Sequence, residues 1–190
     1  MEAPPPGYRV PTGAEGDEIF NDPSVELAWA MKAYEHARIH MSLICAVDPV
    51  DLKLTSRDDE IFEKFKKEFP GFLLETISEP LLKSDESKER WRAFCESFKD
   101  VEDYNYGTML RLDASERYDS DNTTLVPRIQ FLALEIARNR NGINSKYRAK
   151  FKLAAEKDIE GGKRTAALYD QLGVKREDEL AILRGKSGEN

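Results

Sequence analysis

The chain has 190 residues, 40% of them hydrophobic, and its 36 acidic and 29 basic side chains give a formal net charge of −7. This length suits one domain of ordinary size with tails, and no run approaches the ~20 consecutive apolar residues needed to span a bilayer. The acidic, proline-rich start has neither the basic stretch nor the apolar run of a secretory signal. We therefore expect a cytoplasmic protein with no membrane partner, small enough to have access to the nucleus.

The charge is divided unevenly along the chain. Residues 143–190 hold 11 Lys/Arg and 8 Asp/Glu, a balance of +3, so residues 1–142 carry −10. An acidic core argues against the phosphate-neutralising surface of a nucleic-acid binder. We expect no specific nucleic-acid partner, although the basic tail leaves weak RNA contact open beside the commoner explanation, a solvated amphipathic helix.

The N-terminal part predicts an arm followed by a long helix. Residues 1–20 are rich in proline and glycine and poor in apolar residues, which predicts disorder. Asp22 and Pro23 form a helix start, with the cap followed by the first turn, and the helix is expected to run to about Ala46. Its apolar face is expected to consist of Leu27, Met31, Tyr34, Met41 and Cys45.

The next part predicts two further helices with a short strand between them. Thr55 or Ser56 is expected to cap a helix with a phenylalanine-rich stripe, which ends at Pro70–Gly71. The apolar segment Phe72–Ile77 is expected to be a strand. Ser84 is expected to cap the third helix, whose apolar side chains recur at helical spacing.

The centre of the chain predicts a strand, a polar loop and the main core helix. Tyr106–Asp113 alternates between apolar and mostly polar side chains, as a half-buried strand does, and Phe72–Ile77 is its expected antiparallel partner. The loop 114–122 is polar. Pro127–Arg140 is apolar over most of its surface, so we expect a buried helix that begins at Pro127 and ends with a left-handed cap at Gly142.

The last part predicts short helices interrupted by glycine. Gly161–Gly162 is expected to break a basic helix, and the remaining segments are shorter than the ~12–15 residues at which isolated helices become stable. The predicted class is α+β: a helix-rich single domain at 21–142 with a small antiparallel sheet, a disordered arm at 1–20, and a basic, partly helical, flexible C-terminal extension at 143–190.

No motif for catalysis, cofactor binding or metal binding is present. His36 and His40 are one helical turn apart, but no further Cys, His or acidic motif completes a zinc site, and they are expected to lie on a helix flank. The sequence has no GxSxG, phosphate-binding loop or GxGxxG. The two cysteines, Cys45 and Cys95, are expected to be reduced thiols in the core. We therefore predict a protein that is not an enzyme.

A cluster of aromatic and basic residues is a candidate recognition surface. Tyr104 and Tyr106 precede the central strand, and tyrosine gives large contact area at low entropic cost. The simpler interpretation is that one ring packs and the other is exposed, and that the arginines only balance the acidic core. The candidate recognition residues are Tyr104, Tyr106, Arg111, Arg128, Arg138 and Arg140.

Five segments in order resemble one eukaryotic family. They read DPSVELAWAMKAYEHA, VDPVDLKLT, KERWRAFCESF, VEDYNYGTMLRLDAS and PRIQFLALEIARNRNG, and span about Asp22 to Gly142. They resemble the polysaccharide-biosynthesis-domain-containing protein 1 family. The resemblance is weakest from Ile143 onward, where tails in the family vary.

The resemblance implies a small cytosolic chaperone dedicated to translation elongation factor 1-alpha. Such a protein meets the nascent GTP-binding domain of that factor at the ribosome, to which the nascent polypeptide-associated complex recruits it. Two alternatives stay open: a methyltransferase-like or other enzyme of polysaccharide biosynthesis, and an adaptor that binds folded proteins. Against the first, the sequence lacks the glycine-rich strand-to-helix loop that would hold the cofactor.

The end of the chain offers a candidate docking helix for the recruiting partner. Residues 177–183 place acidic residues ahead of an apolar group, the order expected of a short helix that docks in a groove. The alternative is an inert, frayed terminus. The candidate partner-docking residues are Leu180, Ile182 and Leu183.

Overall fold

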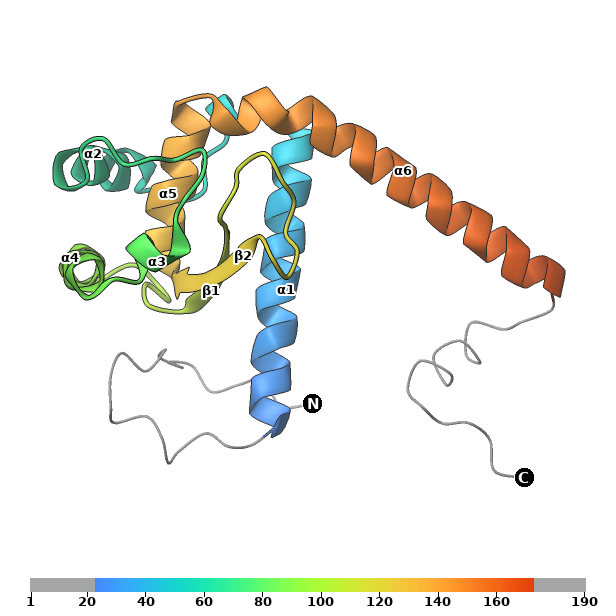
Figure 1. Cartoon of the computed structure of the whole chain (residues 1–190), viewed down its shortest axis with the longest axis horizontal. Coiled ribbons are helices and arrows are strands. Elements are labelled where there is room, and N and C mark those ends of the chain that lie inside the picture. The colour runs from blue at the N-terminus through green and yellow to red at the C-terminus, as the bar shows by residue number, and fades with distance from the viewer. Residues whose placement is uncertain (1–22, 173–190) are drawn as a thin grey trace. The chain divides into compact units, whose positions relative to one another are not determined.

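The computed structural model describes residues 23–172, with side chains at 29–30 and 32–159 (Figure 1). In chain order the elements are α1 (Pro23–Ala46), the 3-10 helix η1 (Pro49–Asp51), α2 (Asp58–Glu68), α3 (Glu79–Leu82), α4 (Asp85–Glu96), β1 (Gly107–Arg111), β2 (Thr123–Pro127), α5 (Arg128–Arg140) and α6 (Ile143–Leu172). The predicted class, a helix-rich α+β protein with a small antiparallel sheet, is confirmed.

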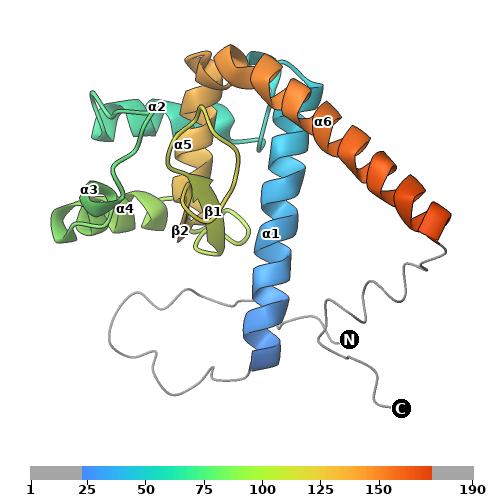
Figure 2. The ribbon, with the colours of Figure 1, turned by 45° about the vertical axis from the view of Figure 1, so that its right-hand side comes forward.

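Helix α5 is the centre of the fold, as its sequence predicts. Every residue from Ile129 to Asn139 is buried, and both views place α1 on one side of α5 and α2 and α4 on the other (Figures 1 and 2). A helix buried all round must bury its polar residues too. Gln130, Glu135 and Arg138 are therefore inside the protein.

Aromatic side chains of α2 and α4 form the apolar half of the core. Phe69, just after α2, stacks on Trp91 of α4 with ring centroids 4.1 Å apart, and Phe65 stacks on the same indole. Phe94 and Phe98 continue this layer and are fully buried. The predicted stripes of both helices are confirmed, because apolar residues at this spacing leave water together when the helix packs.

The helix ends follow the predicted caps in part. The Ser84 hydroxyl accepts a bond from the Ser87 N–H (3.3 Å), and Gly142 takes the left-handed conformation after α5 (φ +71°). The predicted cap of α2 is wrong. The helix begins at Asp58, whose carboxylate reaches back to accept bonds from Leu54 N (3.0 Å) and Thr55 N (2.7 Å).

The sheet has a different partner strand from the one predicted. β1 pairs antiparallel with β2, with Gly107 opposite Pro127 and Arg111 opposite Thr123. Phe72–Ile77 makes only a single bridge, between Thr76 and Asp113. Pro127, expected to open the core helix, is instead the last residue of β2 and the cap of α5.

Helix α1 begins and ends as predicted but buries a different face. Among its described side chains, the buried ones are Ala33, Ala37, His40 and Ile44, whereas Tyr34 is 66% exposed. Small residues allow α1 to approach the sheet closely, and Met41 and Cys45 of the predicted face are half-buried. The side chains of Leu27 and Met31 lie outside the described residues. The expectation that His40 lies on a flank is wrong.

Two units divide the chain: residues 1–149, which hold the elements up to the start of α6, and residues 150–190. Helix α6 is continuous to Leu172, so the predicted break at Gly161–Gly162 is wrong. A glycine inside a helix costs only about 1 kcal/mol relative to alanine, and neighbouring helix formers outweigh it. Between residues 23 and 172, no helix has the length and hydropathy required to cross a membrane.

Candidate functional site

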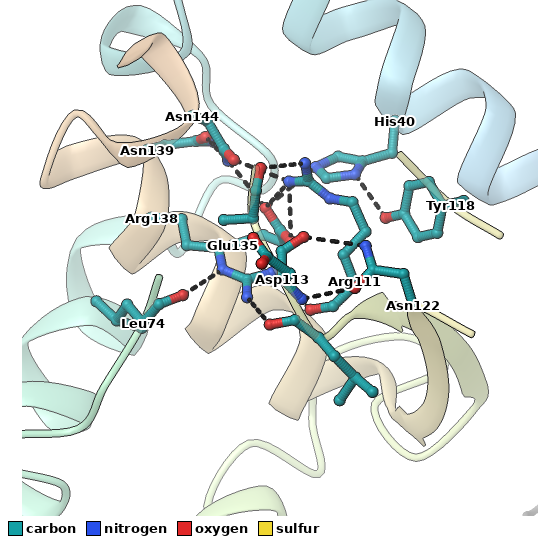
Figure 3. Close-up of polar contacts among 12 residues, drawn as sticks. His40, Leu74, Arg111, Asp113, Tyr118, Asn122, Glu135, Arg138, Asn139 and Asn144 are labelled. Carbon is teal, nitrogen blue, oxygen red and sulfur yellow. Dashed lines mark hydrogen bonds and ion pairs between the residues drawn. The ribbon is translucent and has the colours of Figure 1, made fainter. Parts of the chain in front are cut away.

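Two of the predicted recognition arginines are inside the protein. Arg111 of β1 and Arg138 of α5 are both 0% exposed, and both contact Glu135, which is also 0% exposed (Figure 3). Their side chains are thus not available to a surface. Together with Asn144, His40 and Tyr118 they form what we term the buried polar cluster.

Arg111 links the strand to both neighbouring helices and to the loop that follows it. Its Nη2 donates to Glu135 Oε2 at 3.1 Å and to Asn144 Oδ1 at 2.8 Å, and its Nη1 donates to the Ala114 carbonyl at 3.2 Å. The guanidinium also lies 5.7 Å from the Tyr118 ring centroid. One side chain therefore holds β1, α5, α6 and the loop 114–122 together.

Arg138 joins the end of β1 to the segment 72–77 through backbone carbonyls of both. Its Nη1 donates to Glu135 Oε1 and to the Arg111 carbonyl, both at 2.8 Å, while Nη2 donates to the Leu112 carbonyl at 3.0 Å and Nε to the Leu74 carbonyl at 2.8 Å (Figure 3). The planar fork of arginine suits several acceptors at once. The segment 72–77 lies beside residues 112–114, just after β1, where it makes a single bridge, and the Arg138 guanidinium satisfies its Leu74 carbonyl.

Glu135 stays ionised although it is buried. Burial alone would raise the pKa of its carboxyl, but the positive charges of Arg111 and Arg138 outweigh burial and hold that pKa well below its usual range. The Asn144 amide adds a hydrogen bond of 2.9 Å to Oε2. Glu135 balances one of the two positive charges, and the backbone carbonyls that accept hydrogen bonds from the two arginines stabilise the other.

His40 joins α1 to the buried polar cluster in its neutral form. Its Nδ1 lies 2.8 Å from the Tyr118 hydroxyl, and its Nε2 lies 3.7 Å from Glu135 Oε2. Burial lowers the pKa of His40 to about 3, against the attraction of Glu135. With Nε2 carrying the proton toward Glu135, Tyr118 donates to Nδ1.

The three titratable residues His40, Tyr118 and Glu135 all have pKa values shifted away from the range in which a general acid or base works. Burial and the nearby Glu135 charge raise the pKa of Tyr118, while His40 stays neutral and Glu135 stays ionised at neutral pH. The arrangement instead connects α1, β1, the loop, α5 and the start of α6. Its chemistry is that of a structural crosslink.

Three of the remaining predicted residues lie together near the start of α5. Ile129 N–H donates to the Tyr104 carbonyl (2.9 Å), and the sheet register places Tyr106 and Arg128 just outside the Gly107–Pro127 pair. Tyr104 itself donates to Glu96 at 3.1 Å. Arg140 belongs to the other end of α5, where it pairs with Asp59 and lies over the Phe62 ring.

The other predicted positions divide between a metal question and the tail. Between residues 29 and 159, no group of three or more potential metal ligands comes together. The docking residues Leu180, Ile182 and Leu183 lie outside the described residues, as does the arm at 1–20. Cys95 is buried and Cys45 half-buried, and neither takes part in a disulfide.

Comparison with known proteins decides the family. The model of the PBDC1 protein family matches residues 25–149. The chain belongs to the PBDC1 protein family. This confirms the resemblance found in the sequence, and the matched range holds the whole buried polar cluster.

Curated PBDC1 relatives match over the same region. Human Protein PBDC1 is 52% identical over 125 residues, which cover 65% of this chain and 54% of the relative. The Schizosaccharomyces pombe homologue is 41% identical over 138 residues, covering 70% of this chain and 94% of the relative. The chain thus spans about half the length of the human relative and most of the shorter yeast one.

A solved structure of a yeast protein shares this fold. A solution NMR structure of a Saccharomyces cerevisiae protein superimposes with a TM-score of 0.62 at 38% identity, covering 70% of this chain and 96% of that one. The fold described above is therefore that of an experimentally determined relative.

The sequence did signal some of the buried polar cluster that the prediction missed. Glu135 stands in the middle of a helix predicted to be buried on nearly every face, and a buried carboxylate needs a cationic partner. Arg138 at i+3 was available in the same helix. The partners from β1, α1 and α6 carry no comparable signal, because nothing local marks Arg111, His40 or Asn144 as buried.

Proposed function

We propose that this PBDC1-family chain is a co-translational chaperone of translation elongation factor 1-alpha. It binds the nascent GTP-binding domain of that factor in the cytoplasm, shields it until folding is complete, and reaches the ribosome through the nascent polypeptide-associated complex. The family resemblance is the source of the client and of the recruiting partner, and family membership supports both.

An apolar stripe on α1 is the structural observation that supports this function. Ile39, Leu43 and Val47 recur at i, i+4 and i+8 and are 47%, 37% and 43% exposed, and Val50 of η1 (53%) follows them. Contiguous apolar side chains on a soluble surface usually mark an interaction site. We call these four residues the α1 stripe and assign it to the client.

A chaperone of this kind needs no catalytic group. It needs only a surface that binds an incomplete fold more tightly than the finished one, so that folding of the client lowers the affinity and releases it. The −10 charge of residues 1–142 favours encounter with basic client segments. The α1 stripe contacts exposed apolar residues of the unfinished client. This contact is lost once the folded client has buried those residues.

The test replaces two residues of the α1 stripe and measures capture of the client. We expect Leu43→Ser with Val47→Ser to reduce crosslinking to ribosome-bound GTP-binding-domain chains about tenfold, because side chains at the centre of an apolar contact dominate its energy. The matched control is Leu73→Ser with Leu81→Ser, two leucines that are more exposed but lie outside the stripe. Both variants should keep the wild-type melting temperature.

Two results would contradict the proposal. One is equal capture by the stripe variant and the control variant. The other is equally tight binding of fully folded elongation factor, which would indicate an adaptor for mature proteins.

A further inference from the structure

A positively charged face lies around Tyr106, where α1 meets the start of β1 and α5. Lys32 Nζ is 4.8 Å from the Tyr106 ring centroid, and the sheet register places Arg128 next to Tyr106. Burial lowers the pKa of His36, and the nearby charge of Arg128 lowers it further. Trp29, Lys32 and His36 recur at i, i+3 and i+7, which is one side of a helix. We name these five residues the cationic face.

Neither cation of this face has a carboxylate partner among the described side chains, whereas several other basic residues have one. Arg38 pairs with Glu35, Arg57 with Glu60 and Asp100, and Arg140 with Asp59. Among residues 29–159, no carboxylate lies within ion-pair distance of Lys32 or Arg128. Lys32 and Arg128 can therefore pair with carboxylates of another protein.

Arg128 also has an unfavourable position within its own helix. It is the first residue of α5, whose first turn contains no acidic residue and whose cap makes no side-chain hydrogen bond. The positive end of a helix dipole repels a cation and attracts an anion. An anion at this place would therefore interact favourably with both the side chain and the helix.

Two polar atoms of the face are closed off from water without a hydrogen-bond partner among the described residues. These are Trp29 Nε1 and His36 Nδ1. An indole N–H can only donate, and a buried donor without an acceptor is costly to the fold. Because both atoms are closed off from solvent, neither contacts a ligand on the surface directly, but the NMR signals of both side chains can report a ligand bound beside them.

We propose that the cationic face of Trp29, Lys32, His36, Tyr106 and Arg128 binds a carboxylate-rich segment of a protein partner. The Arg128 fork suits a carboxylate in two-point geometry, and Lys32 adds a point charge. The face is separate from the α1 stripe. The inference goes beyond the chaperone proposal and does not depend on it.

A short acidic polypeptide fits this face better than a nucleic acid does. Polynucleotide binding draws on many phosphate contacts and on release of counterions, and the face offers only two full cations on a chain of net charge −7. An acidic peptide needs only local positive charge, which Arg128 and Lys32 provide.

The test is an NMR titration of the full chain with an acetylated oligoglutamate peptide. The chain has two tryptophans and two histidines, so each signal has an internal control. We expect the Trp29 indole N–H to shift while Trp91 stays, and the pKa of His36 to rise on binding while that of His40 does not.

Charge variants complete the test. Arg128→Gln and, separately, the exposed Lys32→Gln should each weaken the peptide about tenfold, as loss of a charge-assisted contact does. The matched control, Arg38→Gln, removes the same charge from α1 but from a residue already paired with Glu35 at 2.7 Å, and should leave affinity unchanged. The inference is overturned by an unshifted Trp29 signal, by equal weakening in Arg38→Gln, or by an oligouridine probe that binds as tightly at the same signals.

Discussion

His40 is the residue whose protonation most directly challenges the native state. It lies 3% exposed beside two arginines, so burial and the neighbouring cations hold its pKa at about 3, against 6.5 for an unperturbed histidine. Below about pH 6.5 the unfolded chain binds a proton that the folded chain refuses. Stability from this residue is therefore complete above that pH and is lost as the pH falls toward 3.

This gives a prediction for the pH dependence of stability. Between about pH 6.5 and pH 5, the free energy of unfolding of the wild type should fall with a slope approaching 1.4 kcal/mol per pH unit from His40. Glu135 adds a further loss only below its unfolded pKa of 4.5. His40→Asn, which retains an acceptor for Tyr118, should flatten the slope, as urea unfolding at several pH values will show.

His36→Asn serves as the control for that measurement. His36 is only partly buried, and burial and the charge of Arg128 lower its pKa. Because it is less buried than His40, its replacement should alter the slope less. A wild-type slope that His40→Asn leaves unchanged would contradict the assignment of a neutral, buried His40.

At the scale of elements, the buried polar cluster does the work that a larger sheet would do. Arg138 satisfies the carbonyls of Leu74, Arg111 and Leu112, and Arg111 reaches the loop and Asn144. Two short strands alone are marginally stable in water. Side-chain bonds from two arginines thus replace the missing backbone ladder and fix α5 against the sheet.

The second prediction removes the charge that both arginines share. Glu135→Gln leaves two buried guanidinium groups without a counter-charge, and we expect a loss of about 3–5 kcal/mol in the free energy of unfolding. Glu60→Gln is the control, because it breaks an exposed pair with Arg57 of the same nominal type, and it should leave the urea midpoint nearly unchanged. Comparable midpoints for the two variants would show that Glu135 does not hold these elements together.

Helical periodicity predicted most of the helices, but it could not predict which distant segment pairs with β1. The phenylalanine and tryptophan stripes of α2 and α4 follow from helical spacing alone. The left-handed end at Gly142 and the cap at Ser84 follow from residue type. The partner of β1 does not, because Thr123–Pro127 reads as loop followed by helix start, while Phe72–Ile77 reads as a strand that Arg138 then satisfies. Local sequence carries no information on which distant segment supplies a hydrogen bond.

The candidate site was predictable only in its half-buried part near the start of α5. Tyr104, Tyr106 and Arg128 come together because they flank β1 and α5 along the chain. Arg111 and Arg138 were expected beside them, and the structure buries both with Glu135. An arginine is normally exposed, and only the three-dimensional position of a distant glutamate reverses that expectation.

At the scale of the whole molecule, the first unit presents two different surfaces over one rigid centre. The α1 stripe is apolar and the cationic face is polar, and both include residues of α1. Helix α1 is joined to the centre through His40. The α1 stripe is assigned to the client by the proposed function, and the cationic face is assigned to an acidic protein segment by a separate inference.

The most direct test of the chaperone proposal is selective ribosome profiling. The protein is isolated from lysate with the ribosomes that accompany it, and their protected message fragments are sequenced. Our account predicts enrichment confined to elongation factor 1-alpha messages, beginning once part of the GTP-binding domain has left the exit tunnel and lost in the Leu43→Ser, Val47→Ser variant. A flat profile for the wild-type protein would contradict it.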